Sequence, residues 1–375
     1  MTAVGQFDSA EDPALGPLIE RPGLDRPTST ARRGGTSRHR PRSFAVTFLM
    51  TVLVAAFLAP LLQSFLTSLK TPEQTSALNS PVYPADPATF DYEGKTYDVY
   101  LVPIDGEVRQ LALIRKGRQD SDFVDPANPE AGSINWVGAW RTLEQPWQLA
   151  PQWSNYADVW NLIDFPLLLR NTILIAVIGM TGTVVSCTLV AYGFARFRFP
   201  GRNLMLLLLI ATIFLPTAVT LIPTYAIFVK LGWVGTWLPL LVPTFFANAY
   251  DVFLLRQYLL TIPPELDEAA SIDGAGPFRI LTSVIIPQAW PAIIAVAIFH
   301  FVYSWNDFFG PLIYLSGEQD LQPLQVALAR FEGIHYQNPG YIQAGNIMTL
   351  VIPIVLFIIF QRTFTRGIVI TGVEK

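Results

Sequence analysis

The sequence predicts an all-α polytopic membrane protein with six transmembrane helices and a small β-rich extracytoplasmic insert. The chain of 375 residues is 51% hydrophobic and only 14% charged, whereas typical soluble domains carry about 25% charged residues. Its charged residues are clustered, which leaves several runs of about 20 mostly apolar residues, long enough to cross a bilayer. A soluble protein has no means of burying so many segments of this kind.

The first residues, 1–42, are rich in Pro, Gly, Ser and Arg and show no helical or strand periodicity. This composition predicts a disordered arm. A basic stretch before an apolar run is also typical of a signal peptide. Here the apolar run is about 23 residues long and lacks a small-residue cleavage site, so an uncleaved first transmembrane helix over 43–70 is favoured.

Hydropathy predicts six spans, of which the last five belong to a core over 166–375. They run approximately over Phe44–Leu66, Asn171–Ala195, Leu204–Phe228, Trp237–Leu260, Ala289–Leu315 and Ala344–Phe360.

Arginines gather on one set of flanks of these spans, and Lys70 and Lys230 mark the sparser side. By the positive-inside rule, both termini and the loop after the fourth span face the cytoplasm. The expected location is therefore the cell membrane, which the chain crosses several times. The arginines are Arg32, Arg33, Arg38, Arg40, Arg42, Arg196, Arg198, Arg202, Arg256, Arg279, Arg362 and Arg366.

The residues between the first two spans, 71–165, are the predicted extracytoplasmic insert. Tyr97–Ile104 and Glu107–Ile114 are rich in Val, Ile, Leu and Tyr, and Asp105-Gly106 between them favours a type I′ turn. We therefore expect a β-hairpin. Four tryptophans follow, near enough to pack on a small sheet or to lie at the membrane interface: Trp136, Trp140, Trp147 and Trp153.

The sequence offers little for catalysis, cofactor or metal binding. Its one cysteine, Cys187, lies in an apolar run, which excludes an intrachain disulfide and a cysteine-based metal site. Three scattered histidines give no ligand pattern, and the net charge of −4 does not favour nucleic-acid binding. We expect no catalytic residues, no cofactor and no metal.

One segment, Gly94-Lys95-Thr96, resembles the end of a phosphate-binding loop. However, Thr89 stands where that loop needs its first glycine, and the segment leads into the hairpin rather than into a helix. No other Gly-Lys-Ser/Thr sequence occurs. Any ATP hydrolysis must therefore come from another chain.

Residues 261–287 form a polar, helix-prone loop between the fourth and fifth spans. Pro263 and Pro264 suit the first turn of a new helix, predicted over Glu265–Ile272. Three of its residues share one face, and the two alanines among them allow close approach of another surface. They are Leu266, Ala269 and Ala270.

The second half of the loop carries a glycine and two prolines, residues that end or begin helices. Gly274 is placed to end the first helix with a positive φ. Pro277 opens a second short helix through Ile285, and Pro287 is expected to break it where the fifth span begins. The predicted product is a helix–turn–helix unit lying across the ends of the spans.

The first predicted helix of the loop is acidic. An amphipathic helix resting on the membrane surface is the plain alternative, and it calls for lysines or arginines that face anionic lipid. The loop helix and its end carry no base and four acids, which suits a basic protein groove better: Glu265, Asp267, Glu268 and Asp273.

This loop resembles the coupling loop of ATP-binding cassette (ABC) importer permeases. Glu268-Ala269-Ala270 is followed by Gly274 and, after a gap of nine residues, by Val284-x-Ile286-Pro287. In that family the loop docks on a separate ATPase. The resemblance implies coupling roles for Glu268, Ala269, Ala270, Asp273, Gly274 and Pro287, with Glu268 as the ion-pairing residue and Gly274 as the turn.

Other stretches resemble sugar-importer permeases of the maltose-transporter type. They are Ala191 to Gly201, Leu221-Ile222-Pro223, Phe253 to Gln257, Ser304 to Phe308 and the C-terminal Gly372 to Lys375, a weaker candidate contact with the ATPases. The resemblance implies a non-enzymatic permease subunit of a binding-protein-dependent importer that moves a mono- or oligosaccharide by alternating access. Its implied partners are a second permease, two ATPase subunits, an extracytoplasmic solute-binding protein and the sugar. The insert is then either a self-stabilising module or a docking surface for the binding protein or the second permease.

A translocation path is expected where spans are interrupted or carry polar residues. Prolines interrupt the third span, and an Asn-Asp pair lies in the fifth, where it serves either the path or interhelical hydrogen bonds. The neighbouring Tyr and Trp suit either stacking on a sugar or anchoring at the interface. The candidates are Pro216, Pro223, Tyr303, Trp305, Asn306 and Asp307.

Two other functions remain open on the sequence. One is a permease of the same superfamily for an amino acid, peptide or polyamine. The ligand found on its binding protein would distinguish it from a sugar permease. A membrane-anchored interaction protein without transport predicts that no ATPase co-purifies. A secondary transporter is disfavoured, because the spans carry few ionisable groups.

Overall fold

The computed structural model describes residues 40–77, 79–104, 106–335 and 337–369. They divide into two compact units, the first ending at Phe57 and the second beginning at Leu58. The described part of the first unit is the beginning of α1 (Arg40–Ser68), which is mostly apolar and exposed from Phe44 to Phe57. Residues 1–39 of the predicted arm and the predicted contact at Gly372 to Lys375 lie outside the described residues.

Among the described residues, five helical segments are long and apolar enough to cross a membrane, and they correspond to five of the six predicted spans. The chain is therefore a multi-pass membrane protein. The segments are Phe44–Ser68, Phe165–Arg196, Leu238–Leu259, Pro277–Trp305 and Pro339–Gln361.

The predicted third span is not one straight helix. Its place is taken by α5 (Arg202–Ala211), extended by the 3₁₀ turn η3 (Thr212–Phe214), and by α6 (Thr217–Lys230), with a bend of 102° after Phe214. Pro216 disfavours helical geometry at the preceding residue, and that residue is extended with φ −78° and ψ 116°. Counting the bent pair as one span gives six.

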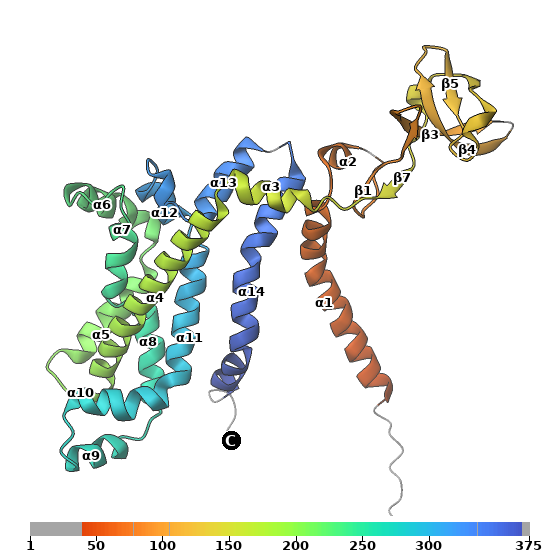
Figure 1. Ribbon diagram of the computed structural model, residues 1–375. Coiled ribbons are helices and arrows are strands. Elements are labelled where there is room, and N and C mark those ends of the chain that lie inside the picture. Colours follow the sequence, from red (N-terminus) through yellow and green to blue (C-terminus); the bar gives the residue numbers. More distant parts are fainter. Residues whose placement is uncertain (1–39, 78, 105, 336, 370–375) are drawn as a thin grey trace, which may run out of the picture. The chain divides into compact units, whose positions relative to one another are not determined.

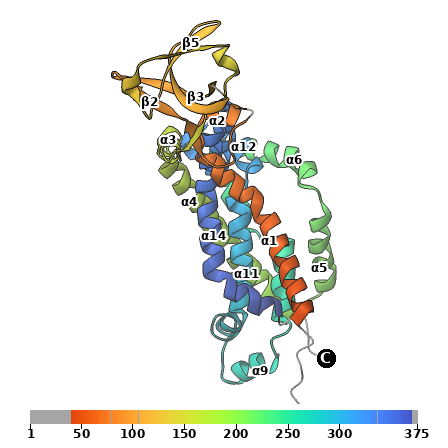
Figure 2. The ribbon, with the colours of Figure 1, turned by 90° about the vertical axis from the view of Figure 1, so that its right-hand side faces the viewer.

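Helix α4 (Phe165–Arg196) forms the centre of the helical part, with α8 (Ala249–Leu259) and α11 (Ile286–Trp305) packed against it (Figures 1 and 2). Their shared core includes Ala191, Val252, Leu255, Ile285 and Val296. A second cluster joins α4 and α11 to α13 (Leu324–Ile334) and α14 (Pro339–Val369). It includes Phe165, Phe301, Trp305 and Leu324.

The fourth span is broken rather than continuous. It consists of α7 (Leu238–Leu241), the 3₁₀ turn η4 (Val242–Phe245) and α8, and the backbone is extended at Phe246 and Asn248.

The expectation that Pro287 breaks a helix is wrong. Helix α10 (Pro277–Ile280) continues through a π-helical turn, η5 (Leu281–Ile285), directly into α11. Pro287 stands in the first turn of α11, where its missing N–H is tolerated once the wider π turn has changed the hydrogen-bond register. The fifth span ends earlier than predicted, at Trp305, and α12 (Phe309–Tyr314) follows after a break.

The β-rich insert contains an antiparallel sheet in the order β2-β3-β4-β5-β6. Ile104 at the end of one predicted hairpin strand pairs with Glu107 at the start of the other, and Gly106 has φ 83°. The strands are β2 (Thr89–Tyr92), β3 (Lys95–Ile104), β4 (Glu107–Arg115), β5 (Asp120–Val124) and β6 (Ile134–Val137), with 3₁₀ turns η1 (Pro129–Ala131) and η2 (Trp140–Thr142).

Two of the four tryptophans cover this sheet. Trp136 lies edge-on to buried Phe123, and Trp140 lies edge-on to buried Tyr100. Gly94 lies in the β2–β3 turn with φ 78°, and Lys95 and Thr96 begin β3. The Gly94-Lys95-Thr96 segment therefore leads into a strand and does not precede a helix.

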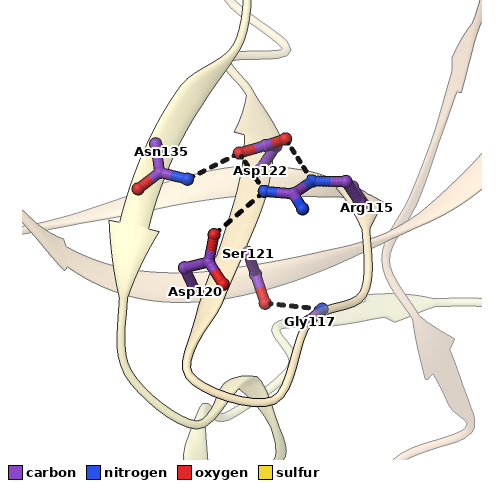
Figure 3. Close-up of polar contacts among 6 residues, drawn as sticks. All are labelled: Arg115, Gly117, Asp120, Ser121, Asp122 and Asn135. Carbon is purple, nitrogen blue, oxygen red and sulfur yellow. Dashed lines mark hydrogen bonds and ion pairs between the residues drawn. The ribbon is translucent and has the colours of Figure 1, made fainter.

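Surface charges also fasten neighbouring strands of the insert (Figure 3). Arg115 donates to Asp122 and, at 3.0 Å, to Asp120, while Asn135 Nδ2 donates to Asp122 Oδ1 at 2.8 Å. These hydrogen bonds, first that from Arg115, hold the pKa of Asp122 below its usual value. Their stabilising effect is lost as the pH falls through that lowered pKa.

A short ribbon of β1 (Ala85–Pro87) and β7 (Trp147–Leu149) leads into and out of this sheet. Gln74 of α2 (Pro72–Ser76) is fully buried and bonds to the backbone of Pro81, Tyr83 and Ala85. Asn155 of α3 (Ser154–Leu162) donates to the carbonyls of Ser68 and Lys70. These buried amides fix the backbone on either side of the insert.

A further 3₁₀ turn, η6 (Gln319–Leu321), lies between α12 and α13.

Candidate functional site

The loop 261–287 contains the predicted acidic helix with the predicted bounds, α9 (Glu265–Ile272). It lies beyond the ends of the packed helices, at the opposite end from α12 and α13 (Figures 1 and 2). None of its residues is buried. Glu268 and Ala269 are exposed, whereas Ala270 is half-buried and packs on the main helical core.

The end of α9 is a Schellman motif, in which two backbone N–H groups fold back onto the last turn. Ala275 N donates to Ala270 O at 2.9 Å, and Gly274 N donates to Ser271 O at 3.0 Å. This geometry requires the left-handed conformation, and Gly274 adopts it with φ 81°. A Cβ at this position meets no atom within 4 Å, so the requirement for glycine comes from the backbone alone.

The exposed surface of the loop includes two large apolar side chains that the sequence reasoning missed. Ile272 is 87% exposed and Phe278 is 72% exposed. With the neighbouring acids Glu268 and Asp273, they give the loop a surface that combines negative charge with apolar area. The signal was present in the sequence, since both are large apolar residues in a polar segment.

Arg196, the last residue of α4, fastens α9 to the packed helices. Its Nε lies 2.6 Å from Asp267 Oδ2, with side chains only 12% and 18% exposed. Its NH2 group donates to Ile262 O at 2.9 Å, just before α9. One side chain thus holds both the entry to the loop and its first helix.

The carboxyl of Asp267 is partly buried where it meets Arg196. Burial raises the pKa of the carboxyl, and the nearby Arg196 charge only partly opposes that effect. Neither Arg196 Nε nor Asp267 Oδ1 has an aligned hydrogen-bond partner within the described chain, so the pair is held mainly by charge. Removing either partner leaves the other charge half-buried, which is costly.

Two further contacts tie the same end of α4 to its surroundings. Tyr192 Oη donates to Pro277 O at 3.3 Å, at the start of α10. Arg256 Nε of α8 donates to Phe194 O at 3.3 Å. The end of α4 therefore contacts the loop before α9, within α9 and after it.

The residues predicted for a translocation path do not form one cluster. Tyr303 is 69% exposed and lines a cavity within the helical part, which none of the other five lines. Trp305 is 2% exposed and stacks on Phe301, so its ring is closed to solute in this conformation. The Asn306 side chain donates back to Val302 O, and Asp307 Oδ1 accepts from Gly310 N at the start of α12.

The two prolines lie elsewhere. Pro216 precedes α6, and Pro223 lies inside it, both with exposed side chains. Their role in a path stays a prediction.

Comparison with known proteins identifies what this architecture is similar to. The family described as "Binding-protein-dependent transport system inner membrane component" matches residues 187–369. An osmoprotective compounds uptake permease protein of Synechocystis sp. is 32% identical over 255 residues, covering 68% of this chain and 85% of that protein.

Other relatives carry different solute names. An arabinooligosaccharides transport system permease protein of Halalkalibacterium halodurans is 32% identical over 54% of this chain and 72% of its own length. An sn-glycerol-3-phosphate transport system permease protein of Pectobacterium atrosepticum is 32% identical over 58% and 79%.

Among solved structures, a chain of a bacterial ABC transporter involved in alginate import has the same fold. The TM-score is 0.61 at 20% sequence identity, with 87% of this chain and 98% of that chain covered.

We predict that Gly274→Val frays the end of α9, because a non-glycine residue with positive φ costs about 1–2 kcal/mol. Hydrogen exchange of the Gly274-position and Ala275 amides should then be about tenfold faster. Gly274→Asn is the matched control, because asparagine tolerates this conformation. Equal protection in the valine and asparagine variants would contradict the backbone explanation.

We also predict that Arg196→Gln exposes α9 to exchange more than Asp267→Asn does, since it removes both the charge and the donor to Ile262 O. The double variant should lose less protection than the sum of the two, with a coupling of about 0.5–3 kcal/mol. Hydrogen exchange of the α9 amides is measured in the purified single variants and in the double variant. Additive effects would show that the two side chains do not interact.

Proposed function

This chain belongs to the family of binding-protein-dependent transport system inner membrane components, and we propose that it is the permease subunit of an ATP-driven carbohydrate importer. The observation that carries the proposal is the exposed acidic helix α9, fastened to the end of α4 through Arg196. Such a surface suits a second protein that pulls or pushes on the loop.

The proposed mechanism is alternating access driven from outside the chain. One of two ATPase subunits docks on the loop, with Glu268 pairing with a basic group and Ala269 allowing close approach. The ATP-driven closure of the two subunits displaces α9. Arg196 passes that displacement to α4, and the unbroken passage from α10 to α11 passes it to the fifth span. The translocation path then turns outward to receive solute.

The membrane orientation follows from the same proposal. The loop 261–287 and both termini face the cytoplasm, where the ATPases are, and the β-rich insert faces outward. There an extracytoplasmic solute-binding protein and a second permease are the partners expected to contact this chain. The insert either stabilises itself or contributes to those contacts.

A carbohydrate is the proposed solute class. Support comes from the relative named for arabinooligosaccharides, together with the sugar-permease motifs in this sequence. A permease for an amino acid, peptide or polyamine is the alternative within the same superfamily. Identifying the ligand that co-purifies with the cognate binding protein separates the two.

We predict that Glu268→Lys impairs both uptake and binding-protein-stimulated ATP hydrolysis by at least tenfold, because it places a positive charge against a basic groove. The measurement uses the assembled transporter in proteoliposomes, with retention of the ATPases on the purified complex as a second readout. Glu130→Lys, an exposed change of the same charge in the insert, is the control for ATPase docking and should leave retention of the ATPases unchanged. Wild-type rates in Glu268→Lys would refute the assignment of the loop.

A further inference from the structure

The broken fourth span borders a cavity that opens at the surface of the helical part. A cavity of about 560 Å³ lies beside the non-helical residues between η4 and α8, with α4 and α11 as its other walls. Within a membrane, non-helical backbone is tolerated only where it is buried in protein or lines an aqueous space. The break and the cavity therefore belong together.

Two glycines of α4 shape this region. A Cβ on Gly182 would lie 2.7 Å from Thr244 Oγ1, and one on Gly179 would lie 3.1 Å from His300 Nε2. Their missing side chains let η4 and α11 approach α4 closely. Ser186 Oγ fixes the same contact by donating to Thr244 O at 3.2 Å.

One side of the cavity presents a carboxylate and an amide. Asn248 Nδ2 donates to Asp251 Oδ2 at 2.7 Å, and Asn248 Oδ1 accepts from Asp251 N at 2.9 Å. The Asp251 residue is only 6% exposed. An ionised carboxylate only accepts hydrogen bonds and has room for several, so a cavity with Asp251 in its lining suits a ligand that brings hydroxyl donors.

The other side presents a hydroxyl, an imidazole and aromatic rings. Thr183 Oγ1 lies 3.1 Å from His300 Nδ1, so the pair shares one hydrogen bond whose direction depends on the histidine tautomer. The Tyr303 ring lies 6.2 Å from that of His300 and is largely exposed, as is Tyr250. Polar side chains are costly at membrane depth and mark functional positions there.

The charge of the cavity lining distinguishes anionic solutes from uncharged ones. Asp251 is the acidic residue of the cavity lining, and no lysine or arginine contributes to that lining. At low dielectric a carboxylate repels a phosphate or a second carboxylate strongly. The lining therefore disfavours an anionic solute, whereas an uncharged ring with many hydroxyl groups finds acceptors on one side and aromatic faces on the other.

We infer that this cavity is a contact site for an uncharged, hydroxyl-rich solute, with Asn248 and Asp251 bonding its hydroxyl groups and Tyr303 packing on its apolar face. The inference rests on the proposed transport function and narrows its solute class. Asp251 and Asn248 also cap α8, so the test needs a readout that a purely structural role does not change.

The experiment uses the complete importer in proteoliposomes with saturating binding protein. The probes are radiolabelled sucrose, trehalose, maltotriose and glycerol as neutral solutes, and sn-glycerol 3-phosphate and galacturonate as anions. We expect ATP-dependent uptake of at least one neutral solute and of neither anion. In Asp251→Asn and Tyr303→Ala, uptake of that solute falls at least tenfold, and its rate relative to a second neutral solute changes.

The matched control is Phe309→Ala, which removes another strongly exposed aromatic ring outside the cavity and should leave uptake and selectivity unchanged. Tyr303→Ala keeps the test valid if Asp251→Asn does not fold, because Tyr303 is 69% exposed. Wild-type uptake and selectivity in both cavity variants, or uptake of an anion, overturns the inference alone. The absence of ATP-dependent uptake of every probe overturns the proposed carbohydrate function and the inference with it.

Discussion

The half-buried ion contact between Arg196 and Asp267 is the interaction on which the position of α9 depends. No residue of α9 is buried, and Ala270 alone among its small residues packs on the main core. Apolar burial therefore does little to hold this helix. The end of α4 does so instead, through the charge of Arg196, its donation to Ile262 O and the Tyr192 contact with Pro277 O.

The same two helices connect the loop with the cavity. Helix α4 carries Arg196 at its end and Thr183 in the cavity wall, and α11 continues from the loop and carries His300. A force on α9 therefore reaches one wall of the cavity through α4 and the other through α10, η5 and α11. The π-helical turn between α10 and α11 is a weak point in that path, because its hydrogen bonds are less regular than those of an α-helix.

The sequence was most informative where local residue chemistry decides the structure. Pro263 and Pro264 before α9, and Gly274 after it, predicted its bounds, and Asp105-Gly106 predicted the hairpin of β3 and β4. These signals act over a few residues, so no tertiary contact is needed to read them.

Features that depend on tertiary packing could not be predicted from the sequence in the same way. The break expected at Pro287 was wrong, because the helix continues from α10 through the π-helical turn η5 directly into α11. Trp305 and Tyr303 look alike in the sequence, yet one is 2% and the other 69% exposed. Asn248, Asp251 and His300 stand out as polar residues in apolar runs, but only the break in the fourth span brings them to one cavity.

The most direct test of the coupling arrangement is the distance between spin labels at Ile272 of α9 and Leu189 of α4, both exposed. It is measured in the complete importer, without nucleotide and with ATP trapped. If α4 and α9 move as one unit, the wild-type distance distribution stays narrow and unchanged between the two states, and Arg196→Gln broadens it. A wild-type distance that shifts on ATP binding, or a distribution that Arg196→Gln leaves unaltered, contradicts the account.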